Sequence, residues 1–197
     1  QTREQHIRRD KATSNICTAQ ALLAIMAGMY ATYHGPEGIK AIASEIHQKA
    51  TALSDALSSN GFKQLNKNFF DTINVETENP ESISEAAIAA EINLRVAEKT
   101  ISISIDQTTT IADLNAILKV FGIDNQISSL SESAIDHGIA RTSEYLTHSV
   151  FNSYHSETEM MRYIKRLENK DISLTHSMIS LGSCTMKLNA AAELYPI

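Results

Sequence analysis

The sequence predicts an α+β fold in which helices pack on a small, mostly antiparallel sheet. Segments with helical periodicity and segments with two-residue alternation form separate groups along the chain, and short connections join the alternating segments. The chain has 197 residues, of which 43% are hydrophobic and 20% charged. These values are typical of a globular protein with room for one domain, or for a small domain with an extension.

The first predicted helix covers residues 15–34. Thr13, Ser14 and Asn15 offer side chains that can cap its start. The segment that follows leaves almost no polar face; its large apolar residues are Ile16, Leu22, Leu23, Ile25, Met26, Met29 and Tyr30. A helix that is apolar all round must be covered by other elements. We therefore expect this helix to pack against parts of a larger protein.

Glycine and proline divide the next segments. Gly35 and Pro36 break the first helix, and Pro36 suits the first position of a second one. Apolar residues then recur at spacings of three and four from Ile39 to Leu57, and Asn60-Gly61 supplies a left-handed cap. The elements predicted after this cap are a strand at 69–75, a short helix after Asn79-Pro80, strands at 92–96 and 101–105, and a helix between Thr109-Thr110 and Gly122.

The remaining third of the chain has less periodicity. Residues 123–155 are rich in serine and are interpreted as a linker with a helical turn or two. Residues 156–159 form a capping-box pattern that opens a helix, and its inward side chains would be Met160, Met161, Ile164 and Leu167. Residues 171–197 have no clear period. The predicted organisation is a small domain at 1–122, a linker at 123–155 and a helical and extended arm at 156–197.

Composition excludes several classes of function. The net charge of −6 argues against nucleic-acid binding, which requires basic surface. No apolar run approaches the roughly 20 residues of a membrane span, and the N-terminal residues do not resemble a signal peptide. Cys17 and Cys184 are too few for a disulfide framework. The seven histidines show no short metal-ligand spacing, so no metal site is predicted and structural roles are expected for them.

The most chemically dense segment is Gly182-Ser183-Cys184-Thr185. Small hydroxyl groups after a glycine can present donors to a carboxylate or phosphate, although such a run is more often an ordinary polar loop. Cys184 and His176 could also be drawn as a nucleophile and base, but nothing in the sequence places them face to face. Among the seven histidines, His155 beside the capping-box pattern is the one of most interest.

Four stretches of the chain, at 3–24, 33–38, 155–171 and 173–189, together resemble the P-protein of the glycine cleavage system. P-proteins have two halves, each with the fold of type I pyridoxal-phosphate (PLP) enzymes, and only the second half binds PLP. The resemblance implies that 1–122 is the small C-terminal domain of the first half. Residues 123–155 would then connect the halves, and 156–197 would be the N-terminal arm of the second half. Both ends of the chain are expected to be cuts in a longer polypeptide.

The family's activity follows from the same resemblance. P-proteins decarboxylate glycine through a PLP aldimine and transfer the aminomethyl group to the lipoyl arm of the H-protein. The implied cofactor is pyridoxal 5′-phosphate, and the implied partners are glycine, lipoylated H-protein, the remainder of the P-protein and a second copy in a homo-oligomer. Neither nucleic acid nor a membrane is expected as a partner. The implied compartment is the bacterial cytoplasm, or the mitochondrial matrix of a eukaryote.

The resemblance assigns no catalytic residue to this chain. The lysine that binds PLP lies in a motif that none of the ten lysines here matches, Lys187 included. Ser183, Cys184 and Thr185 would instead lie close to the substrate and cofactor of the second half. Ser180 stands where the family usually has proline, which could loosen this loop because proline restricts the backbone.

A freestanding interaction module without catalytic activity is the alternative. The arm separates the two hypotheses, since a module would pack Met160, Ile164, Leu181 and Met186 on its own core. A part of an enzyme would leave them without partners or bury them in a second copy. On the enzyme hypothesis we expect the isolated chain to self-associate.

Replacing both Ser183 and Thr185 by alanine in a full-length P-protein should raise the Michaelis constant for glycine or lower turnover by more than about tenfold, because two donors near the substrate are lost. Steady-state kinetics of glycine decarboxylation would measure the change. Kinetics equal to those of the unsubstituted enzyme would contradict the assignment.

Overall fold

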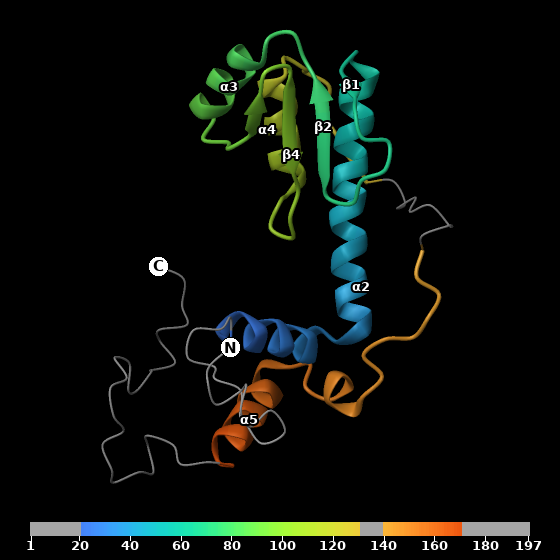
Figure 1. The fold of residues 1–197 in the computed structure, drawn as a ribbon, viewed down its shortest axis with the longest axis vertical. Coiled ribbons are helices and arrows are strands. Elements are labelled where there is room, and N and C mark those ends of the chain that lie inside the picture. Colours follow the sequence, from blue (N-terminus) through green and yellow to red (C-terminus); the bar gives the residue numbers. More distant parts are fainter. Residues whose placement is uncertain (1–20, 131–139, 171–197) are drawn as a thin grey trace, which may run out of the picture. The chain divides into compact units, whose positions relative to one another are not determined.

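A computed structural model describes residues 21–130 and 140–170 (Figure 1). The elements are α2 (Ala21–Ser59), β1 (Lys63–Gln64), β2 (Thr72–Glu76), α3 (Pro80–Ala89), β3 (Arg95–Ala97), β4 (Thr100–Ser104), α4 (Ile111–Val120), the 3₁₀ helix η1 (Ser149–Asn152) and α5 (Glu157–Glu168). Contacts group the chain into two compact units. The sheet unit comprises 37–144, and the corner unit comprises 1–36 with 145–197.

Helix α2 consists of two helical segments separated at Gly35. The backbone angles of Gly35, φ 63° and ψ −178°, are not helical, and Pro36 follows directly. Because glycine adopts a positive φ without steric cost and proline suits a first helical position, the chain breaks and restarts here. The predicted break is confirmed, whereas the predicted cap at 13–15 lies outside the described residues.

The sheet has four strands in the order β1-β2-β4-β3, and all three pairings are antiparallel. In the central pair, Ile73 lies opposite Ile103 and Val75 opposite Ile101. Side chains alternate across a strand, so these four apolar residues share one face and are buried there. The predicted antiparallel sheet is therefore confirmed.

Two strands begin later than the sequence pattern predicted. β2 starts at Thr72 rather than at residue 69, and β3 starts at Arg95 rather than at residue 92. Phe69, Ile92 and Leu94 still pack against the core, although they lie outside the ladder. The apolar pattern therefore continues beyond the hydrogen-bonded residues, which is why it overestimated the strands.

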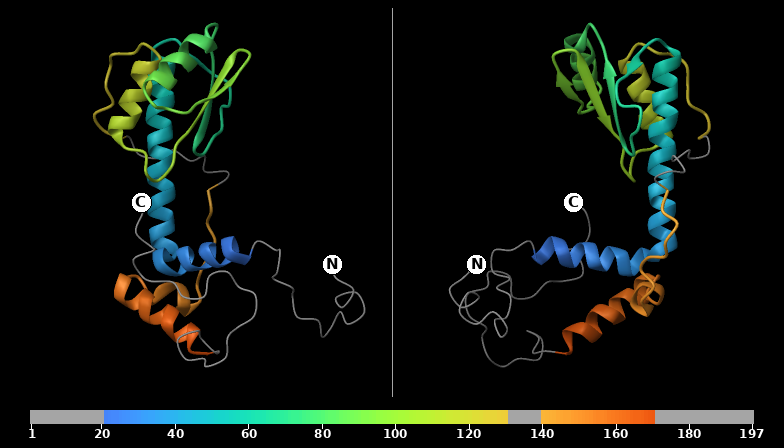
Figure 2. Two further views of the ribbon diagram at one scale, coloured as in Figure 1. Left: turned by 90° about the vertical axis from the view of Figure 1, so that its left-hand side faces the viewer. Right: turned by 45° about the vertical axis from the view of Figure 1, so that its right-hand side comes forward.

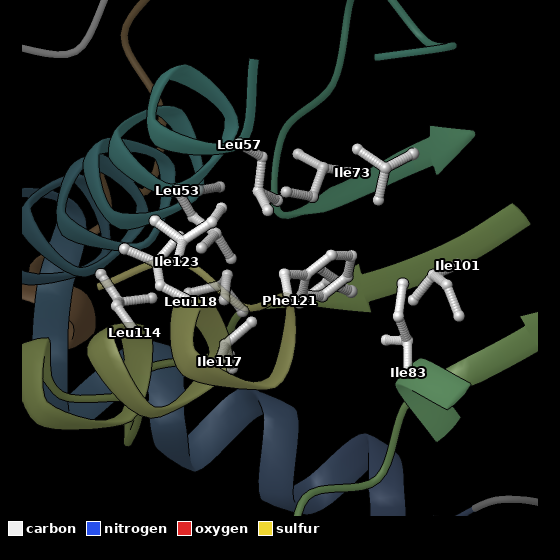
Figure 3. Packing of buried hydrophobic residues seen from close by; sticks show 14 residues of the cluster. Leu53, Leu57, Ile73, Ile83, Ile101, Leu114, Ile117, Leu118, Phe121 and Ile123 are labelled. Carbon is white, nitrogen blue, oxygen red and sulfur yellow. The ribbon is translucent and has the colours of Figure 1, made fainter. Parts of the chain in front are cut away.

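The core of the sheet unit lies between the sheet and its helices. Figure 3 shows Leu53 and Leu57 from α2 and Leu114 and Leu118 from α4 directed into this layer. In Figure 2, α4 and the second segment of α2 cover the same side of the sheet. The other buried members of the cluster are Ala50, Ile73, Val75, Ile83, Ile101, Ile103, Ile105, Ile117, Phe121 and Ile123.

Glycine ends both major helices of the sheet unit. Gly61 has φ 90° and Gly122 has φ 73°, and in each case the following amide donates to a carbonyl five residues earlier. This is the geometry of a Schellman cap. Phe62 and Phe121 then meet edge to face with ring centres 5.1 Å apart. Both glycine ends are as the sequence predicted.

Packing on the core continues beyond residue 122. Ile123 is buried, and Ile127 and Leu130 pack against the same cluster. The side chain of Asn115 holds the backbone of Ile127 from both sides, accepting from its amide at 2.8 Å and donating to its carbonyl at 3.1 Å. The first part of the predicted linker is thus attached to the sheet unit.

Helix α5 is the main described element of the arm. The Ser156 hydroxyl accepts from the Glu159 amide at 3.3 Å, as predicted, and donates to the Glu159 carboxylate at 3.0 Å. Met160 and Leu167 are half-buried, but Met161 and Ile164 are exposed. The prediction that all four point inward is wrong for Met161 and Ile164, because the described part of the corner unit offers no surface to cover them.

Two carboxylates before and within α4 are held by threonines. Asp106 accepts from the hydroxyls of Thr108 and Thr109, and these bonds lower its pKa. The Asp113 carboxylate accepts hydrogen bonds from both the hydroxyl and the backbone amide of Thr110, which completes a capping box. The hydroxyl bond, followed by the amide bond, lowers the pKa of Asp113. Hydrogen bonds to the charged form favour that form.

Acid should weaken the sheet unit through these two groups. A folded-state pKa below the ordinary value of 3.8 means that the stabilisation is complete above that pH and is lost as pH falls through the folded pKa. Asp106→Asn and Asp113→Asn should therefore reduce the loss of unfolding free energy between about pH 6 and about pH 3. Urea denaturation at both pH values measures this, with the exposed Asp124→Asn as control. An acid response equal to that of the unsubstituted chain would contradict the prediction.

Candidate functional site

The residues that the sequence placed nearest to substrate lie outside the described residues. This holds for Ser183, Cys184 and Thr185, and for the possible pair of Cys184 with His176. The structure does describe what precedes them in the chain, namely α5 and the segment that attaches it. The part of the candidate site that the described residues form is therefore its attachment point.

That attachment point is a corner formed by Tyr33, Gly35 and Pro36 with Tyr145, Phe151 and His155. The end of a helix leaves backbone carbonyls without intrahelical partners. His155 Nδ1 lies 2.7 Å from the Tyr33 carbonyl oxygen, and because a carbonyl only accepts, Nδ1 carries the proton. The Tyr145 hydroxyl donates to the Pro36 carbonyl at 2.7 Å. Side chains from 145–155 thus bind the backbone on both sides of Gly35.

Gly35 also permits a close approach that no other residue would allow. A β-carbon built there would lie 2.7 Å from His155 Cε1 and 2.7 Å from the Phe151 carbonyl oxygen. Both distances are shorter than van der Waals contact, and the second atom belongs to the backbone. The absence of a side chain at Gly35 therefore sets how closely η1 and His155 pack on the end of the first α2 segment.

An aromatic stack fixes the start of α5. The rings of Tyr154 and Tyr163 lie 4.3 Å apart with an interplanar angle of 12°. The Arg166 guanidinium sits over both rings, 5.4 Å and 5.3 Å from their centres, and also donates to the Tyr154 hydroxyl. These contacts join residues before the helix to its third turn, so α5 follows directly from the corner.

Sequence reasoning identified part of the corner. The sequence predicted a helix break at Gly35 and Pro36 and marked His155 as the histidine of most interest. It gave no indication that Tyr145 or Phe151 would lie there. Tyr145 lies 109 residues from its partner Pro36. No periodic pattern reports a contact across that separation, and no signal within the chain marked it.

The described residues do not fit a site that holds PLP through lysine. Seven of the described lysines are exposed, namely Lys40, Lys63, Lys67, Lys99, Lys119, Lys165 and Lys170. Lys49 is buried, but its ammonium group forms an ion pair with Glu45 at 2.7 Å on the same helix. That ion pair already occupies the side chain of Lys49 within its own helix. We derive no catalytic step through the cofactor from these residues.

The histidines of the described segments have structural partners. His47 Nδ1 lies 2.8 Å from the Phe70 carbonyl, and His148 Nδ1 accepts from the Val150 amide at 3.2 Å. Within the described ranges no three metal-binding side chains come together. In those same ranges, no helix combines the length and apolar character needed to span a bilayer.

Gly35→Ala should disrupt the corner, because alanine is strained at φ 63° and its methyl group would collide with Phe151 and His155. Amide hydrogen exchange should become faster at residues 151–155. Gly28→Ala is the matched control: a β-carbon there meets nothing within 4 Å, and alanine favours a helix. Equal exchange rates in the two variants would show that the close approach has no structural effect.

Comparisons with known proteins agree with one another. The sequence model of the family GDC-P, described as Glycine cleavage system P-protein, matches residues 1–121. The chain is 57% identical to glycine dehydrogenase (decarboxylating) of Vibrio parahaemolyticus over 205 residues. It is also 57% identical to the enzymes of that name from Aliivibrio salmonicida and Christiangramia forsetii.

These matches cover all of this chain but only 22% of the Vibrio protein, 22% of the Aliivibrio protein and 21% of the Christiangramia protein. The chain thus spans about a fifth of the length of the curated relatives it matches. Sequence identity of 57% over all 197 residues of this chain establishes the family. The chain belongs to the P-protein family of the glycine cleavage system.

Proposed function

We propose that this chain is the part of a glycine-decarboxylating P-protein that supplies its shape rather than its reactive groups. The observation that carries the proposal is the 57% identity, over the whole chain, to an enzyme named glycine dehydrogenase (decarboxylating). The described lysines support it, since none of them fits the role of binding PLP. The cofactor would be held by other parts of the polypeptide, and glycine and lipoylated H-protein would be bound by the complete enzyme.

Within that enzyme, residues 1–122 would be the small C-terminal domain of the first PLP-transferase-like half. The antiparallel sheet with its helices supports this assignment. Residues 123–155 would connect the halves, and 156–197 would be the N-terminal arm of the second half. The corner supports the assignment of 123–155 as a connection, because it attaches the residues before α5 to the end of the first α2 segment.

The arm would bring Ser183, Cys184 and Thr185 close to the substrate and cofactor. Bound PLP withdraws electrons as carbon dioxide leaves glycine, and the protein supplies orientation and electrostatics. Ser183 and Thr185 would donate hydrogen bonds to the carboxylate or the cofactor. A complete enzyme of this kind would act in the cytoplasm of a bacterium, as its bacterial relatives suggest.

A freestanding interaction module is the competing function, and one observation is compatible with it. Large apolar side chains of α2 and α5 are exposed, including Leu22, Met26, Met161 and Ile164. Exposed apolar surface marks a missing partner. It does not distinguish a partner molecule from other parts of the same polypeptide, so a functional experiment is required.

The decisive experiment replaces the matching segment of the Vibrio parahaemolyticus relative with this chain. With PLP, lipoylated H-protein and carboxyl-labelled glycine, the chimera should release labelled carbon dioxide within about tenfold of the parent rate. The isolated 197-residue chain should release none and should bind no PLP covalently.

The relative without the segment is the control and should be inactive. A chimera that folds, binds PLP and still fails to decarboxylate glycine would contradict the proposal. Decarboxylation by the isolated chain would contradict it from the other side, because the chain would then be a complete catalyst.

A further inference from the structure

We propose that Asn60, at the C-terminal end of α2, is a site of spontaneous deamidation. The folded sheet unit prevents the reaction, and opening of the last turn of α2 permits it. The proposal follows from the sequence Asn60-Gly61 and from the hydrogen bonds that hold both residues. Water is the only co-reactant, so the site is independent of the proposed function.

The reaction at an Asn-Gly pair begins at the backbone nitrogen of the glycine. After losing its proton to solvent base, this nitrogen bonds to the asparagine Cγ, and the bond from Cγ to Nδ2 breaks as ammonia leaves with a proton from solvent. Water then adds to one carbonyl carbon of the five-membered ring, and the ring bond from that carbon to nitrogen breaks. An amide is thus exchanged for a carboxylate without oxidation or reduction, which leaves aspartate or isoaspartate. Glycine hinders ring closure least, because it has no side chain.

The folded chain opposes the first step at both reacting atoms. The Gly61 N–H donates to the Ser58 carbonyl at 3.1 Å, so the nitrogen that must attack is hydrogen-bonded. Asn60 Nδ2 donates to the Ala56 carbonyl at 2.8 Å. That bond directs the side chain back toward the N-terminus of the helix, whereas Gly61 lies on the C-terminal side. The attacking nitrogen and Cγ are therefore held in an unproductive arrangement.

Two further contacts couple this arrangement to the core. The Phe62 N–H donates to the Leu57 carbonyl at 3.1 Å and so encloses Gly61, which has φ 90°. The Phe62 ring meets the Phe121 ring edge to face, with centres 5.1 Å apart. Leu57 is completely buried, and Figure 3 shows it in the same core as Phe121. Loosening of the packing at this end of the core would therefore release the cap.

Hydrogen bonds, and not burial, protect the site. Ser58, Ser59, Asn60 and Gly61 are all exposed. A β-carbon built at Gly61 would meet nothing within 4 Å, so the space beside the reacting nitrogen is open to water. Helix ends lose their hydrogen bonds in local openings far more often than a domain unfolds. The rate of deamidation should therefore be the rate in an open chain multiplied by the fraction of time that the last turn is open.

The product would keep the cap open. A carboxylate at position 60 has no hydrogen to donate to the Ala56 carbonyl. It also places a negative charge at the C-terminus of a helix, where the helix dipole disfavours it. Isoaspartate in addition takes Cβ into the backbone, so the two following amides no longer lie opposite the carbonyls to which they donate. A transient opening would thus leave a permanent change at the end of α2.

Deamidation rates in the folded and the unfolded chain test the proposal. The 197-residue chain and a peptide of residues 56–65 are each incubated at neutral pH with and without denaturing urea. Mass spectrometry in water labelled with heavy oxygen measures the exchange of amide for acid at Asn60, and an isoaspartate-specific methyltransferase detects the rearranged product. Asn68 is exposed and precedes the bulky Phe69, so it should stay unmodified throughout and is the internal control.

Asn60 should react at the rate of the peptide when the chain is in urea, and at least about tenfold more slowly when the chain is folded. Equal rates in the folded and the unfolded chain would overturn the protection by the fold. Absence of reaction in urea would overturn the site itself.

Phe121→Leu tests the coupling to the core, because it removes the ring contact with Phe62 and keeps an apolar side chain. The folded variant should react at least about threefold faster than the folded unsubstituted chain, with the rate in urea unchanged. An unchanged rate in the folded variant would contradict the coupling. If the variant does not fold, the comparison of the unsubstituted chain in its two states still decides the proposal.

Asn60→Asp tests the effect of the product by introducing the carboxylate directly. Amide hydrogen exchange at Gly61 and Phe62 should become faster than in the unsubstituted chain. Exchange at Gly122 and Ile123, which form the matching cap of α4, should not change. Equal exchange at Gly61 and Phe62 in the two chains would contradict the inference that the product keeps the cap open.

Discussion

The corner depends on one backbone constraint, the left-handed conformation of Gly35 together with the space that its missing side chain leaves. The positive φ breaks α2, and Pro36 restarts it. The empty β-carbon position admits the Phe151 carbonyl and the His155 ring. The Tyr33 carbonyl at the end of the first segment accepts from His155, and the Pro36 carbonyl accepts from Tyr145. Both properties of glycine therefore contribute to attaching the residues before α5 to the end of the first α2 segment.

The two compact units differ in how they obtain stability. Among the described residues, every buried apolar side chain belongs to the sheet unit. That unit joins a sheet face to α2 and α4 and caps both helices with glycine, so it has the components of an independent core. The described part of the corner unit relies on hydrogen bonds and an aromatic stack and leaves several large apolar residues exposed, among them Leu22 and Ile164. Such a unit gains its hydrophobic stabilisation only when another surface covers it.

Local signals predicted the elements better than their limits. Glycine and proline located the ends of α2 and α4, because a positive φ or a missing amide acts within two or three residues. The capping residues Thr110 and Ser156 located the starts of α4 and α5 for the same reason. The strands were overestimated, since Phe69, Ile92 and Leu94 pack on the core without joining the ladder. Periodicity reports burial, and hydrogen-bonded pairing is a separate property.

The sequence by itself determined the helices, those of their ends that glycine, proline or a capping residue marks, the antiparallel sheet and the resemblance to P-proteins. Each of these depends on residues that are close together in the chain or on stretches of shared sequence. Only the tertiary structure decided that Tyr145, Phe151 and His155 meet the break at Gly35. It also decided that Met161 and Ile164 face outward. Contacts across more than 100 residues depend on how the chain returns to itself, and no local pattern encodes that path.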